Sequence, residues 1–140
     1  IYHTTENSID SVLATAVTTI KNGGGGDGPE NDVEALLFAQ KEYKESQHYI
    51  LIADNIAPMR DVELIKKLKK PVRVIVCGAS KVVNPQYLKL AYDTKGSLHT
   101  IEEDIDELLH EIKEGEVIDI YGRKFKLVGE EFILLQPKKT

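Results

Sequence analysis

The sequence predicts an α/β protein: a Rossmann-like parallel sheet with helices on both faces, followed by a C-terminal three-stranded β meander. Two continuous apolar runs, at 48–53 and 72–77, are typical of parallel strands that are buried on both faces. Around them lie segments with apolar residues at helical spacing. Strands that alternate with helices through short connections predict right-handed crossovers between parallel neighbours.

Each expected helix has a signal at its start. Asn7 or Ser8 can cap the first helix, and Pro29 is expected as the first residue of the second. Asp61 is expected to cap the third, and Asn84 precedes a proline that opens the fourth. The expected helices cover 9–22, 29–43, 62–68, 85–91 and 102–113, and the expected strands of the sheet cover 1–4, 48–53, 72–77 and 97–100.

The C-terminal part changes pattern. Three short apolar segments, at 117–121, 125–128 and 132–135, are separated by turn residues that include Gly122 and Gly129. This pattern predicts a meander of antiparallel strands. We therefore expect an α/β domain over residues 1–114 and a meander extension over residues 115–140.

Composition narrows the range of functions. The net charge of −5 argues against nucleic acid as a partner, because such binding depends on basic contacts to phosphate. No apolar run is long enough to span a membrane. The single cysteine, Cys77, rules out an internal disulfide, favours a cytoplasmic location and is expected to be a buried thiol. Neither a nucleophile nor a general acid–base pair stands out, so we do not expect an enzyme.

The loop "GGGGDGPEND" at 23–32 raises the question of what it binds. A phosphate loop would follow a strand, whereas this one follows a helix, and its carboxylates would repel a phosphate. Carboxylates suit a hard divalent cation, and Asp54 ends a strand at the edge where open α/β sheets bind ligands. Glu30 begins a helix near that edge. The alternative, equally compatible with the spacing, is that Asp27 caps a helix and Asp54 caps a turn.

The motif Gly25-Gly26-Asp27-Gly28-Pro29-Glu30, with the stretches "HYILIADNIAPMRD", "PVRVIVCGA" and "GSLHTIEEDIDELL", resembles the von Willebrand factor type A domain. The resemblance covers roughly residues 1–112. It is closest to bacterial members and to the integrin I-like domain. It implies a metal-ion-dependent adhesion site, with Glu30 and Asp54 as Mg²⁺ or Mn²⁺ ligands and Asp27 as the ligand of a neighbouring ion.

One departure from the family bears on the metal. The family motif Asp-x-Ser-x-Ser, which follows the first strand, occurs nowhere in this sequence. We expect the domain to be partial, with the missing elements upstream of Ile1, or the metal site to be lost. Because two carboxylates cannot complete a six-coordinate site, we expect weak or no metal binding.

Three hypotheses about function follow. The first is an adhesion-type module that binds a protein partner at the carboxyl edge of the sheet, with or without a metal ion. The second is a metal-free structural or assembly subunit that docks through its C-terminal meander. The third is an unrelated flavodoxin-like or receiver-like domain. A receiver would need paired acids after its first strand and a lysine after its fifth, and the sequence offers no convincing set of these residues.

Overall fold

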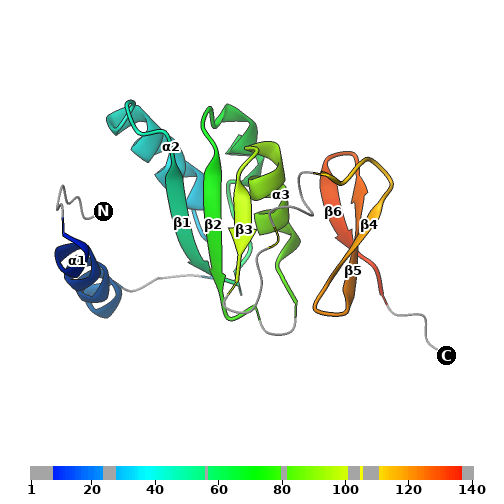
Figure 1. The fold of residues 1–140 in the computed structure, drawn as a ribbon, viewed down its shortest axis with the longest axis horizontal. Coiled ribbons are helices and arrows are strands. Elements are labelled where there is room, and N and C mark those ends of the chain that lie inside the picture. The colour runs from blue at the N-terminus through cyan, green and yellow to red at the C-terminus, as the bar shows by residue number, and fades with distance from the viewer. Residues whose placement is uncertain are drawn as a thin grey trace.

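The structure is a computed structural model that describes residues 8–23, 28–55, 57–79, 82–100, 105 and 111–136. These residues form a mixed α/β fold with one parallel and one antiparallel three-stranded sheet, as the sequence predicts (Figure 1). The predicted strand at 1–4 and nearly all of the predicted helix at 102–113 lie outside the described residues. The elements are α1 (Ile9–Asn22), α2 (Asp32–Glu42), β1 (Tyr49–Asp54), the 3-10 helix η1 (Val62–Lys67), β2 (Val72–Cys77), α3 (Pro85–Asp93), β3 (Ser97–His99), β4 (Val117–Ile120), β5 (Arg123–Val128) and β6 (Glu131–Leu134).

The parallel sheet has the strand order β1-β2-β3. β1 and β2 are parallel neighbours, as predicted, and their register pairs Tyr49 with Val72 and Asp54 with Cys77. η1 connects them, and β3 extends the sheet on the other side of β2. Because all three strands are parallel, their carboxyl ends meet at one edge of the sheet, which we call the carboxyl edge.

One face of this sheet carries the core. Val72, Val74 and Val76 of β2 are fully buried against α3 and share one core with residues of α2 and η1. On the opposite face, Ile50 and Ile52 of β1 are 59% and 68% exposed. Over the described residues only one face of the sheet is therefore covered, whereas the sequence predicted cover on both faces. Helix α1 does not supply it, because none of its residues is buried. We call this second face the uncovered face.

Local capping signals explain where two helices start. The Ser8 side chain accepts a hydrogen bond from the Ser11 amide (3.2 Å) at the start of α1. The Asn84 side chain accepts one from the Gln86 amide (3.0 Å), and Pro85 is the first residue of α3. Both caps follow the rules on which their prediction rested. None of the described helices has the length and apolar character needed to cross a membrane.

The meander β4-β5-β6 packs against α3, which lies between the two sheets (Figure 1). Tyr92 of α3 meets Phe132 of β6 edge to face, with ring centroids 5.7 Å apart. Lys89 of α3 donates to the Glu130 carbonyl (2.9 Å) and pairs with the Glu131 carboxylate (3.3 Å). The buried residues of both sheets belong to one hydrophobic cluster.

Candidate functional site

Side-chain amides hold the loops at the carboxyl edge together. Asn55, directly after β1, donates to the Val82 carbonyl and accepts from the Asn84 amide (2.7 Å). Asn84 in turn donates to the Ala57 carbonyl (3.1 Å). These bonds link the loop after β1 to the segment that leads into α3. Because they cross between segments, they fix the loops on which the carboxylates of this edge are carried.

Glu30 lies at this edge, although the local structure differs from the prediction. Its amide donates to the Pro58 carbonyl (3.0 Å) and its carbonyl accepts from the Arg60 amide (2.7 Å), which forms an isolated parallel bridge with Met59. Helix α2 starts only at Asp32, so the prediction that Pro29 is its first residue was wrong. The long-range pairing takes the backbone groups of Glu30 that a helix would otherwise have used.

Asp61 has a different role from the predicted one. It makes no side-chain cap on η1; instead, its Oδ2 atom accepts a hydrogen bond from the Glu34 amide in the first turn of α2 (2.7 Å). Asn31, at the N-cap of α2, makes no such bond. Asp61 is only 5% exposed, and its other oxygen, Oδ1, is buried with no hydrogen-bond partner in the described structure.

Asp32 is the electrostatic centre of this edge. Tyr87 of α3 donates its hydroxyl hydrogen to Asp32 Oδ2 (2.9 Å). Burial raises the pKa of Asp32; the Tyr87 hydrogen bond opposes this, and the charges of Glu30, Asp61 and Asp54 add to it. Burial and the Asp32 charge also raise the pKa of Tyr87, so the phenol stays protonated and remains a donor.

Asp54 ends β1 and belongs to the uncovered face, since it follows Ile50 and Ile52 at alternate positions. Its carboxylate is exposed but close enough to Asp32 to affect the pKa of that group. Cys77 stands opposite Asp54 in the register and is exposed as well. The expectation of a buried thiol was wrong, because alternate residues of β2 face the side of the sheet that no described element covers.

The structure thus brings two of the three expected ligands to one edge. Glu30 and Asp54 both lie near Asp32, and Asp27 lies outside the described residues. Across the described part of the chain, no group of three or more His, Cys, Asp or Glu side chains is arranged to hold a metal ion. These carboxylates therefore supply only part of a ligand set. Among the described residues, Asp61 Oδ1 is the buried side-chain atom that lacks a hydrogen-bond partner, which a cation or a donor group would satisfy.

Sequence reasoning missed three members of this site. The sequence pattern does not single out Asp32 or Tyr87, and it predicts only a local helix cap for Asp61. Asp32 is the last residue of the loop at 23–32, and its place in the first turn of α2 is only a weak signal. The contacts of Asp61 and Tyr87 span 27 and 55 residues, which no local pattern encodes.

Replacing Asp32 by Asn is expected to stabilise the protein at neutral pH. The folded protein holds the Asp32 proton more tightly than the unfolded chain, so ionisation of this group costs stability above its raised pKa. The penalty vanishes as pH falls below the ordinary value of 3.8. Urea unfolding in EDTA should show a gain for Asp32→Asn at pH 7 that shrinks towards pH 4. A gain independent of pH would contradict the electrostatic origin.

Comparison of the chain with protein-family models, curated proteins and solved structures found no match.

Proposed function

We propose that the chain is a non-enzymatic protein-binding module of von Willebrand A type, which engages its partner at the carboxyl edge of the parallel sheet. The observation that carries the proposal is the gathering of Glu30, Asp54 and Asp61 around Asp32, where each charge raises the pKa of that carboxyl. Such a concentration of negative charge on fixed loops favours a bound cation. The fold also supports it, with parallel strands that place these loops at one edge.

The cation in this proposal is Mg²⁺ or Mn²⁺. Mg²⁺ commonly binds through one or two carboxylates and keeps several of its waters. Glu30 and Asp54 would hold it directly or through water, and a carboxylate of the partner would take one of the remaining positions. Because the described residues offer no complete ligand set, we expect a dissociation constant of about 1 mM or weaker for the chain alone.

A thermal-shift titration tests the cation. At ten times the dissociation constant, binding to the folded state alone adds about 1.4 kcal/mol of stability. For a domain of this size, we expect a rise of roughly 3–5 °C in melting temperature with Mg²⁺ or Mn²⁺. Asp54→Ala and Glu30→Ala should reduce the rise.

Glu42→Ala is the matched control, since Glu42 is an exposed acid at the far end of α2 and its loss changes the net charge equally. An equal rise in all three variants would place the cation elsewhere.

Protein binding is tested by capture on immobilised protein. Partners retained in Mg²⁺ should be released by EDTA, lost with Asp54→Ala and kept with Glu42→Ala. Retention that is indifferent to EDTA and to Asp54→Ala would contradict a role for the carboxyl edge.

The meander offers a second candidate surface. Its inner face is occupied by α3, but Val117 and Ile133 of its outer face are 46% and 47% exposed. A structural subunit that docks through the meander would use these side chains. Binding that survives Asp54→Ala and is lost with Ile133→Ser would favour this alternative.

A further inference from the structure

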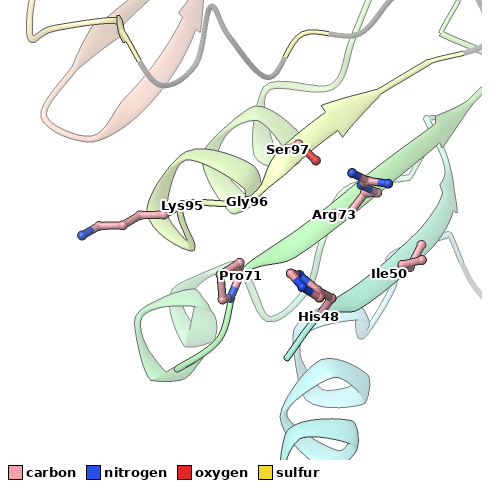
Figure 2. Close-up of a pocket in the computed structure, with 7 residues that line it drawn as sticks. All are labelled: His48, Ile50, Pro71, Arg73, Lys95, Gly96 and Ser97. Carbon is pink, nitrogen blue, oxygen red and sulfur yellow. The ribbon is translucent and has the colours of Figure 1, made fainter. Parts of the chain in front are cut away.

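A second site lies at the end of the sheet opposite to the carboxyl edge. The amino-terminal ends of the three strands border a cavity of about 560 Å³, which we call the basic pocket (Figure 2). Its walls include His48 before β1, Arg73 in β2, Lys95 in the turn after α3, and Ser97 at the start of β3. The pocket opens on the uncovered face, because Arg73 lies between Ile50 and Ser97 in the register of that face.

The charge of the pocket lining is opposite in sign to the net charge of the chain. The whole protein has a net charge of −5, yet the cations Arg73 and Lys95 line the cavity together with His48, and no acid lines it. In the described structure, none of these three side chains has a hydrogen bond or an ion pair. An arginine with no acidic partner beside a cavity is a ready receptor for a carboxylate or a phosphate.

Lys95 lines the rim of the pocket and has a strained backbone conformation. Lys95 follows the end of α3 with a φ of 53°, a conformation that usually belongs to glycine at this helix position. Its amide donates to the Tyr92 carbonyl (3.1 Å) and the Gly96 amide to the Ala91 carbonyl (2.9 Å), as in a Schellman motif. Figure 2 shows the Lys95 side chain reaching outwards from the rim. A glycine would fold more easily here, so the lysine has no evident structural purpose.

The pocket also has an apolar wall. Ile50 is 59% exposed, and Pro71 is a second apolar residue that lines the cavity. On the opposite side, the Ser97 hydroxyl is 2.7 Å from His99 Nε2. This contact orients the Ser97 hydroxyl, which lies next to Arg73 in the register. The site therefore combines an anion receptor with a small hydrophobic surface, the usual composition of a small-molecule pocket.

We propose that the basic pocket binds a small ligand in which a carboxylate or phosphate group is attached to an apolar body. Arg73 makes the direct contact with the anion, Lys95 attracts it from the rim, and Ile50 packs against the apolar part. This binding is independent of the carboxyl edge, which lies at the other end of the strands.

Two probes test the proposal at constant ionic strength: inorganic phosphate and benzoate. Amide NMR signals of Arg73, Gly96 and Ser97 should shift in a saturable way with at least one of them. Saturation with phosphate alone assigns a phosphate ligand, with benzoate alone a carboxylate, and with both a general anion site. If the shifts saturate with neither phosphate nor benzoate, the proposal is overturned.

Three variants distinguish binding at a specific site from non-specific electrostatic attraction. Arg73→Gln should weaken binding about tenfold or more, as expected for the loss of a charge-assisted hydrogen bond. Lys95→Gly should weaken it about threefold while the protein becomes no less stable, because the strained residue is relieved. Lys67→Gln, which removes an exposed cation from η1, is the control and should bind as the wild type does. Equal weakening in all three variants would show only non-specific attraction and would refute the site.

Discussion

Gly96→Ala is expected to lower the free energy of unfolding by about 3 kcal/mol or more. A Cβ atom on Gly96 would lie 1.9 Å from the Val72 carbonyl oxygen and 2.8 Å from the Val72 nitrogen. These are backbone atoms at the start of β2, so the clash cannot be relieved by rotating a side chain. The Val72 amide also donates to Thr94 Oγ1 (3.3 Å), which ties the end of α3 to the same point. Relief would require β2 and the end of α3 to separate.

Urea unfolding followed by circular dichroism measures this loss. Gly28→Ala is the matched control, since a Cβ there would have no atom within 4 Å and Gly28 has no positive φ. We expect that control to be neutral or slightly stabilising. A loss below about 1 kcal/mol for Gly96→Ala would mean that the backbone adapts easily, and that the close approach of the α3 end to β2 is not rigid.

Phe125→Ala is expected to cost about 3–5 kcal/mol. Phe125 is fully buried in β5, where it pairs with Ile118 on one side and Leu134 on the other. Removal of its ring would leave a cavity at the centre of the meander that its hydrogen-bonded neighbours could fill only in part. Because the core of the meander is continuous with that of the parallel sheet, both sheets should lose stability together.

Thermal unfolding of this variant should therefore give one transition at a lower temperature. Phe38→Ala, at a position on α2 that is 38% exposed, should have a clearly smaller effect. Two separate transitions for Phe125→Ala would show that the meander folds independently of the α/β part, in conflict with the Tyr92–Phe132 contact and the Lys89 bonds that join them.

The elements that the sequence predicted well are those set by local signals. The apolar runs of β1 and β2 and the caps at Ser8 and Asn84 depend on residues within a few positions of each other. The exposure of Ile50 and Ile52 could not be foreseen, because an apolar run is the same whether one or both faces of its strand are covered.

The candidate site was only partly predictable for a related reason. Asp54 was placed correctly, since the end of a parallel strand fixes the edge on which its last residue lies. Asp61 was misassigned because a local rule made it the cap of η1, whereas tertiary contact makes it the cap of α2. Glu30 likewise pairs across the sequence with Met59 instead of continuing a helix from Pro29.

Manganese-induced broadening of backbone amide NMR signals tests cation binding at the carboxyl edge most directly. Paramagnetic Mn²⁺ broadens the signals of nearby nuclei even when it binds weakly. At substoichiometric Mn²⁺, the amides of Glu30, Asp32, Asp54 and Asp61 should broaden before all others, and Asp54→Ala should abolish this order. Earliest broadening around the acidic side chains of 111–119 or 128–131, with the four edge amides still sharp, would contradict the proposed site.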